Sequence, residues 1–225
     1  NTELPSMDFA SLTSLNTLTI RQNRELITLK GLEQLCHLTY LSLEDSSKVT
    51  HLPPLSSLKK LNKLILFDCS SLAQLPPLGS LANLTWLYLS GCSSLTQLPP
   101  LDSLTNLTEL VLLECNNLTQ LPPLDNLKNL VELDLSWCKN LHKLPSGIRG
   151  IKSLRKLHLL YMHLHDLPDW LPEITENFSL DTPWDSKEEK ATIYLRGTTV
   201  DSIPEMSIFE QPYEVTKKWF EDRNK

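Results

Sequence analysis

The chain has 225 residues, of which 40% are hydrophobic and 21% are charged. This composition is typical of a folded chain with one domain or one elongated array, and it excludes a disordered protein. A formal net charge of −6 argues against nucleic acid or an anionic membrane surface as the main partner, because both select clustered Lys and Arg. No apolar stretch approaches the roughly 20 residues needed to cross a bilayer, so we expect no membrane insertion.

Residues 1–14 precede the first repeated unit and carry four large apolar side chains, Leu4, Met7, Phe9 and Leu12. A repeat array exposes its core at both ends unless something covers it. We therefore predict an N-terminal cap over residues 1–14.

Residues 15–171 contain seven near-copies of one unit. Five of the units begin at a constant interval, at Leu38, Leu61, Leu84, Leu107 and Leu130, and two further units begin at Leu15 and Leu154. The copy that starts at Leu84 reads LTWLYLSGCSSLTQLPPLDSLTN. Self-similarity of this kind indicates an array in which each unit buries its apolar face against its neighbours.

Each unit contains two local signals. Around Tyr88, the residues Leu87 and Leu89 alternate with period 2, which is typical of a short strand with one buried face. The LPPL segment that follows excludes a regular helix, because Pro lacks a backbone donor and pushes the preceding residue toward extended geometry. We predict polyproline-like or 3₁₀ return segments and one sheet of parallel strands, at residues 17–20, 40–43, 63–66, 86–89, 109–112, 132–135 and 156–159.

The pattern LxxLxLxxC/NxxLxxLPxLxxL resembles the leucine-rich-repeat family. This resemblance implies an α/β-type repeat solenoid, a horseshoe with a parallel sheet on its concave side and largely irregular or 3₁₀ structure on its convex side. The strings CSSLxxLP and LPPLGSL are similar to the repeat domains of plant intracellular immune receptors and of bacterial cytoplasmic or effector repeat proteins.

Four of the five cysteines, Cys69, Cys92, Cys115 and Cys138, recur once per unit at the turn that follows the strand. A redox or metal ladder is one interpretation. The alternative, which we favour, is a row of small buried residues that donate weak S–H hydrogen bonds to backbone carbonyls. We expect no metal and no cofactor, and we expect Cys36, outside the row, to be the accessible thiol.

If the leucines at the first, fourth and sixth positions of each unit face inward, the third, fifth and seventh positions face out from the concave sheet. Among these, a stripe of apolar groups with carboxylates beside it is what protein-binding hot spots look like. The alternative is that strand positions take aromatic residues for cross-strand packing alone. The predicted partner-binding residues are Tyr40, Glu44, Ile65, Phe67, Trp86, Tyr88, Glu109, Val111, Leu113, Glu132 and Asp134.

Carboxylates also mark the rim of this face at the eighth position of the units, where Asp45, Asp68 and Glu114 are followed by Trp137 and Tyr161. They favour a protein partner with a basic or amphipathic surface. We expect Ser90 to face solvent. We also expect the neighbouring histidines His158, His163 and His165 to be surface groups.

Residues 172–225 break the period. A degenerate unit is expected from Ile193 to Pro204, followed by a C-terminal cap helix that starts near Pro212. Four N-x-S/T triplets, which start at Asn83, Asn106, Asn117 and Asn177, are N-glycosylation acceptors in secreted proteins, although a repeat rich in Asn, Leu and Thr also generates them by composition.

The sequence contains no phosphate-binding glycine loop, no G-x-S-x-G and no HExxH, so we predict no enzymatic activity. The first functional hypothesis is the sensing domain of a cytoplasmic immune or defence receptor, with further domains of the same chain as possible partners. The others are a stand-alone bacterial adaptor or secreted effector, the substrate-reading part of a ubiquitin-ligase effector, and a glycosylated extracellular recognition module.

Overall fold

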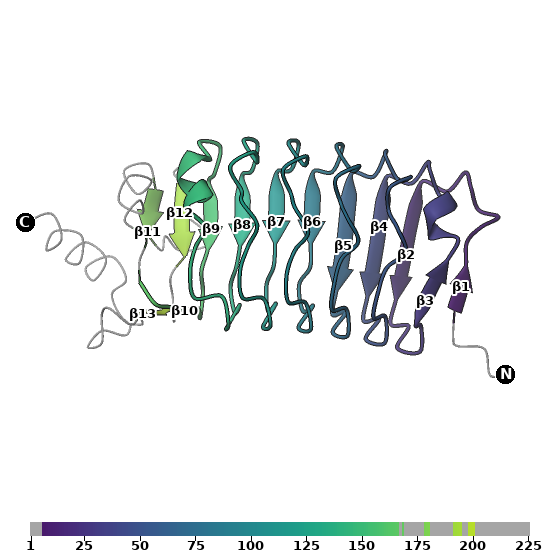
Figure 1. The fold of residues 1–225 in the computed structure, drawn as a ribbon, viewed down its shortest axis with the longest axis horizontal. Coiled ribbons are helices and arrows are strands. Elements are labelled where there is room, and N and C mark those ends of the chain that lie inside the picture. Colours follow the sequence, from purple (N-terminus) through teal and green to yellow (C-terminus); the bar gives the residue numbers. More distant parts are fainter. Residues whose placement is uncertain (1–5, 167, 169–177, 181–190, 195–197, 201–225) are drawn as a thin grey trace, which may run out of the picture.

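The computed structural model describes residues 6–166, 168, 178–180, 191–194 and 198–200. Within them, nine parallel strands lie side by side in one sheet, in the order β11-β12-β9-β8-β7-β6-β5-β4-β2 (Figure 1). The strands are β2 (Thr17–Arg21), β4 (Tyr40–Glu44), β5 (Lys63–Phe67), β6 (Trp86–Tyr88), β7 (Glu109–Val111), β8 (Glu132–Asp134), β9 (Lys156–His158), β11 (Phe178–Leu180) and β12 (Ala191–Tyr194). The seven strands predicted from the repeat are therefore confirmed.

Two smaller parallel pairs lie outside this sheet. Strand β1 (Ser6–Asp8) pairs with β3 (Thr28–Lys30), and β10 (His163–Leu164) pairs with β13 (Thr199–Val200). Among the described residues the helices are two short 3₁₀ turns, Leu32–Gln34 and Ser146–Gly150, so the return segments are irregular, as predicted. The predicted cap helix near Pro212 lies outside the described residues.

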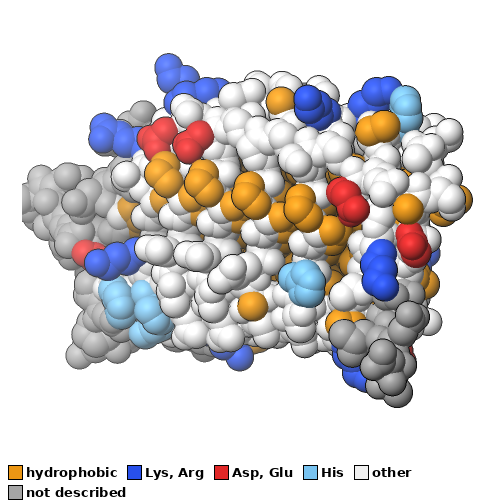
Figure 2. Space-filling view, turned by 45° about the vertical axis from the view of Figure 1, so that its right-hand side comes forward, with side chains coloured by type: hydrophobic (Ala, Val, Ile, Leu, Met, Phe, Trp, Pro, Cys, Tyr) orange, Lys and Arg blue, Asp and Glu red, His pale blue; other side chains and the backbone are white. Residues whose placement is uncertain are grey.

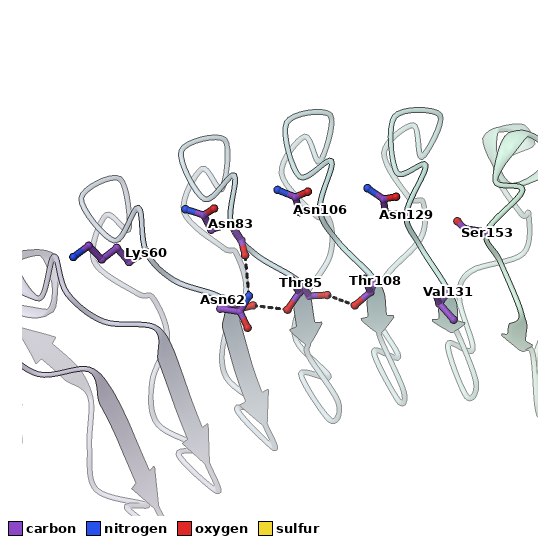
Figure 3. Close-up of a pocket in the computed structure, with 9 residues that line it drawn as sticks. All are labelled: Lys60, Asn62, Asn83, Thr85, Asn106, Thr108, Asn129, Val131 and Ser153. Atoms are coloured by element: carbon purple, nitrogen blue, oxygen red, sulfur yellow. Dashed lines mark hydrogen bonds between the residues drawn. The ribbon is translucent and has the colours of Figure 1, made fainter.

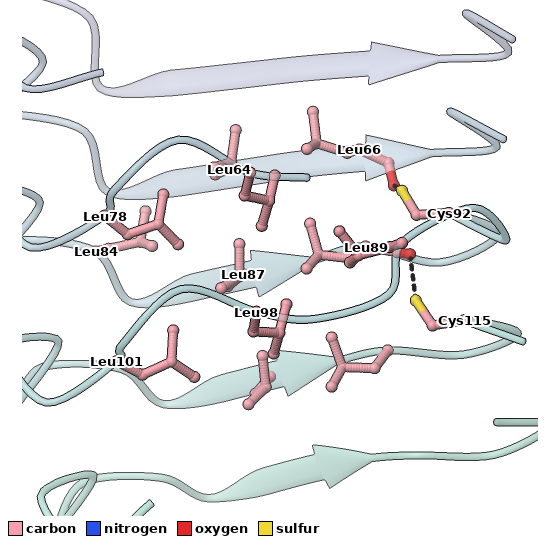
Figure 4. Close-up of a cluster of buried hydrophobic side chains, with 14 of the residues drawn as sticks. Leu64, Leu66, Leu78, Leu84, Leu87, Leu89, Cys92, Leu98, Leu101 and Cys115 are labelled. Atoms are coloured by element: carbon pink, nitrogen blue, oxygen red, sulfur yellow. Dashed lines mark hydrogen bonds between the residues drawn. The ribbon is translucent and has the colours of Figure 1, made fainter. Parts of the chain in front are cut away.

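The register of the sheet places equivalent repeat positions beside each other. Leu64 pairs with Leu87, and Leu87 pairs with Leu110, so the fourth position of every unit faces the same core. Leucines from successive coils form one continuous apolar ribbon behind the sheet (Figure 4). Because each coil covers its neighbours, burial in the array is close to complete for these side chains.

The degenerate unit continues the sheet. Ile193 in β12 pairs with Leu157 in β9 and is buried, so it takes the same core position. A short way further along the chain, Thr198 is buried at the position that the cysteines hold in earlier coils, and its hydroxyl donates to the Leu159 carbonyl. The array therefore continues past residue 171 in the described residues of β12 and Thr198.

On the side opposite the sheet, the LPPL segments expose one proline in each of four consecutive coils, namely Pro54, Pro77, Pro100 and Pro123. Figure 2 shows a row of hydrophobic side chains that runs along the molecule. These prolines keep the return path extended, because their fixed φ and missing donor exclude a helix there.

Candidate interaction surface

All eleven predicted partner-binding residues lie on the exposed face of the sheet, which we call the sheet face. Tyr40, Trp86, Glu109 and Glu132 share one row of paired positions across β4 to β8, and Lys63 completes it. A second row holds Ile65, Tyr88, Val111 and Asp134, and a third holds Glu44, Phe67 and Leu113. Phe67 is 46% exposed, and the other ten are partly exposed.

At the centre of the sheet face, Trp86 and Tyr88 form a stacked pair. Their ring centroids are 5.7 Å apart and their planes differ by 8°. The Lys63 ammonium on the neighbouring strand lies 3.1 Å from the Trp86 ring centroid, a cation–π contact, and the Tyr88 hydroxyl donates to the Glu109 carboxylate. Both rings are thus held in position by residues of the strands on either side.

Burial and the hydrogen bond to Glu109 raise the pKa of Tyr88 above its ordinary value. The hydroxyl therefore stays protonated at physiological pH and remains a donor to this carboxylate. The Tyr88 ring therefore presents apolar surface, while its hydroxyl is already hydrogen-bonded within the sheet.

Most carboxylates of the sheet face have partners within the chain. Glu44 accepts a hydrogen bond from Ser42 Oγ at 2.9 Å and lies 3.0 Å from Arg21 Nε. Glu132 lies 3.0 Å from Lys156 Nζ. A basic partner would have to compete with these contacts, so the sheet face is less acidic toward a partner than the sequence suggests.

Two expectations about exposure are wrong. Ser90 does not face open solvent but is only 7% exposed, because a short side chain on the sheet lies below the level of the larger residues around it. His158, expected at the surface, is also buried, and this burial lowers its pKa despite the nearby Asp134 and Glu132. His163 and His165 are exposed, as predicted.

The rim of the sheet face contains one residue per coil in the left-handed backbone region. The row runs Gln22, Asp45, Asp68, Gly91, Glu114, Trp137 and Tyr161, with φ between 52° and 72°. This conformation costs an L-residue about 1–2 kcal/mol, with Gly exempt and Asn and Asp more tolerant. Trp137 and Tyr161 stack with their ring centroids 4.2 Å apart. An aromatic pair of this kind stabilises a protein by only about 0.5–1.5 kcal/mol, which is less than the cost of two left-handed residues.

The structure also assembles a histidine cluster that sequence reasoning missed. The His142 ring lies 4.6 Å from the His165 ring and 5.4 Å from the His163 ring, between centroids. His142 Nδ1 is 2.8 Å from the His163 carbonyl, and His163 Nδ1 is 2.7 Å from Thr199 Oγ1. The signal in the sequence was that His142 and His165 lie about one repeat apart, which brings them to neighbouring coils.

The cysteine row is buried and its thiols are free. Cys92 donates to the Leu66 carbonyl at 3.5 Å and Cys115 to the Leu89 carbonyl at 3.2 Å, in each case to the preceding coil (Figure 4). Burial raises the pKa of Cys69 and of Cys138 to about 12, which keeps these thiols protonated and unreactive. Cys36 is exposed, as predicted.

A polar groove follows the edge where the strands begin (Figure 3). Three of its asparagines donate their amides to carbonyls of the preceding coil, among them Asn83 to Lys59 at 2.8 Å and Asn106 to Ala82 at 2.9 Å. The hydroxyls of Thr85 and Thr108 also donate to carbonyls of the preceding coil, those of Asn62 and Thr85. The residues of the triplets at Asn83 and Asn106 therefore have structural roles in joining the coils.

Comparison with known proteins gives one family match. Residues 82–126 match the family described as leucine rich repeats, in two copies. The matched unit recurs in register across the sheet, so the fold is a parallel-sheet solenoid similar to that of leucine-rich-repeat proteins. A search of curated proteins gives no significant match.

Solved structures of leucine-rich-repeat proteins are similar to the chain. The repeat domain of the type III effector XopL is 26% identical over 67% of this chain and 71% of that one, with a TM-score of 0.37. A Leptospira interrogans protein is 20% identical over 85% and 69%, with a TM-score of 0.40. The Arabidopsis receptor kinase HAESA, solved with a peptide hormone and a co-receptor, is 18% identical over 87% and 46%, with a TM-score of 0.39.

Within the described residues, no group of three or more His, Cys, Asp or Glu side chains is arranged to hold a metal ion. No helix in that part of the chain is long and apolar enough to span a bilayer. The surface that stands out is therefore the sheet face with its aromatic centre.

Proposed function

We propose that the chain is a protein-recognition module that binds a protein partner on its sheet face and has no catalytic activity of its own. The observation that carries this proposal is the pair of Trp86 and Tyr88, stacked and partly exposed at the centre of the face. Leucine-rich-repeat solenoids are in general scaffolds for protein–protein interaction.

The aromatic centre has the properties of a binding hot spot. Trp and Tyr contribute a large apolar area with few rotatable bonds, and hot spots cluster near the middle of an interface. Lys63 and Glu109 fix both rings before any partner arrives, which lowers the entropy lost on binding. Phe67 and Leu113 extend the apolar area toward the rim.

The partner surface should be amphipathic. Its apolar part covers the stripe formed by Ile65, Tyr88 and Val111, which lie side by side in the second row. Its basic groups should meet the rim, because Glu44, Glu109 and Glu132 are already engaged within the chain.

As the biological setting we propose the sensing segment of a cytoplasmic immune or defence receptor, whose repeats this sequence resembles. Reduced cysteines support a reducing compartment: the four buried thiols each donate to a backbone carbonyl and none is in a disulfide.

The test is a binding comparison between Trp86→Ala and a control on another face, Lys128→Ala, an exposed residue. The unaltered chain is used to capture its partner from the source organism, and each variant is then titrated with the purified partner. Trp86→Ala should weaken binding at least about 30-fold, the equivalent of roughly 2 kcal/mol for a hot-spot aromatic. Lys128→Ala should bind as the parent does.

Thermal melting of both variants separates lost binding from lost folding. Trp86 faces away from the core, so its replacement should remove only the contacts with Lys63 and Tyr88 and leave a cooperative transition. Equal binding by the folded Trp86→Ala variant and the control contradicts the proposal.

A further inference from the structure

The left-handed row at the rim ends in three consecutive coils that carry long side chains, Glu114, Trp137 and Tyr161, with φ of 61°, 61° and 54°. In the coil before them the same position holds Gly91, with φ of 72°. The repeat therefore accepts glycine at this turn, and the strain of the three larger residues is not required by the fold. Strain that is retained in this way is typical of functional positions.

The chemistry of these three side chains suits a cation. Glu114 is exposed and, among the described residues, its carboxylate makes no hydrogen bond or ion pair. Trp137 on the next coil, about 4.8 Å away along the array, is 36% exposed and stacks on Tyr161. An aromatic face attracts positive charge, and an adjacent carboxylate adds a charged acceptor.

Two contacts within the chain show that its indole rings attract ammonium groups. Lys63 Nζ lies 3.1 Å from the Trp86 ring centroid, and Lys139 Nζ lies 5.9 Å from that of Trp137. The second distance is near the limit for a cation–π contact, so the Trp137 ring is only weakly engaged by Lys139.

We propose that Glu114, Trp137 and Tyr161 form a receptor for one arginine side chain of the protein partner. The guanidinium stacks on the Trp137 ring and donates to the Glu114 carboxylate. Arginine fits better than lysine, because its planar group stacks on rings and binds a carboxylate through two parallel hydrogen bonds. The inference rests on the proposed function, whose sheet face it extends: Leu113 and Leu160, just before Glu114 and Tyr161, are partly exposed there.

The test uses a probe in place of the partner. N-acetyl-arginine methylamide is titrated into the ¹⁵N-labelled chain at constant ionic strength, and the Trp137 indole N–H signal is assigned with Trp137→Phe. The matched probe is the citrulline analogue, which has nearly the same shape and no charge. The arginine probe should give a saturable shift of this signal and the citrulline probe should not.

Variants assign the contact to the proposed groups. Glu114→Gln should lower the affinity for the arginine probe about tenfold. Lys139→Gln should raise this affinity, because a competing cation is removed. Asp68→Asn, two coils away in the same row, should leave it unchanged. Glu114→Gly should also abolish binding of the probe, while its melting temperature should be no lower than that of the parent. A merely structural role for the Glu114 side chain does not predict this combination.

Equal shifts with both probes, or an unchanged affinity in Glu114→Gln, overturn the proposal. Because no partner is present, this result is independent of the Trp86→Ala experiment. If Trp86→Ala abolishes partner binding while the parent chain does not bind the arginine probe, the sheet face is still the binding site and the rim receptor is absent.

Discussion

The central coils and the first coils of the array are built from the same unit but differ in how well it is completed. In the central coils, Leu64, Leu87 and Leu110 are fully buried, and a thiol in each turn donates to the preceding coil. In the first coil, Leu18 is 9% exposed, and in the second coil the hydroxyl of Ser46 is buried without a hydrogen-bond partner. A coil is thus only as stable as the neighbours that cover it.

The same turn position is filled differently in the coil that contains β12. Thr198 holds the turn position there, and its hydroxyl donates to the Leu159 carbonyl as the thiols of the central coils donate to theirs. What recurs along the array is a small buried donor that reaches the preceding coil. The donor can be a thiol or the Thr198 hydroxyl, whereas the Ser46 hydroxyl has no partner.

The largest loss of stability is expected from truncating a leucine at the fourth repeat position of a central coil. Leu87→Ala should lower the free energy of unfolding by about 2–5 kcal/mol, because a fully buried leucine leaves a cavity between two covering coils. Leu18→Ala should cost less, because Leu18 lies at the end of the array and is already partly hydrated. Urea titrations of the two variants measure the difference, and equal losses contradict the comparison.

A smaller effect concerns alkaline pH and the thiol row. Burial raises the pKa of Cys138 to about 12 from its ordinary value of 9.0. Between these values the unfolded chain has lost the thiol proton and the folded chain keeps it, so stability falls as pH rises. The slope from one such thiol approaches about 1.4 kcal/mol per pH unit.

Cys138→Ala removes this contribution. The stability difference between the parent and the variant should therefore shrink as urea titrations move from pH 8 to pH 10, while the effects of Lys and Tyr ionisation cancel in the difference. A difference that stays constant with pH would show that the thiol is not held in its protonated form by the fold.

The smallest change in the free energy of unfolding is expected from exchanging serine and cysteine at the buried turn position. Ser46→Cys should raise the free energy of unfolding by about 1 kcal/mol, because a buried hydroxyl without a partner is replaced by a less polar thiol like that of Cys69, which donates to a carbonyl of the preceding coil. Cys92→Ser should lower it by a similar amount. If both substitutions shift the urea midpoint in the same direction, the hydrogen bond is not what distinguishes the two coils.

The fold could be predicted almost completely from the sequence, because the constant interval between equivalent leucines fixes strand, turn and return path at once. The same interval places Lys63, Trp86 and Glu109 in one row, so their neighbourhood was also predictable. The pairing of Tyr88 with Glu109 was not, because it depends on side-chain rotation across coils.

Exposure on the sheet face was predicted less well than its register. Alternation says that Ser90 and His158 point away from the core, but their accessibility depends on the height of the surrounding side chains. The left-handed backbone at the turn could not be predicted either, because Glu, Trp and Tyr, the residue types at positions 114, 137 and 161, rarely adopt this conformation.

Side-chain footprinting with hydroxyl radicals shows whether recognition takes place on the sheet face. The chain is oxidised alone and with its captured partner, and the modification of individual residues is compared by mass spectrometry. Binding on the sheet face should strongly protect Phe67, Trp86 and Tyr88 and leave Pro77 and Pro100 on the opposite side unchanged. Protection of those prolines, with Trp86 and Tyr88 as reactive as in the free chain, would contradict it.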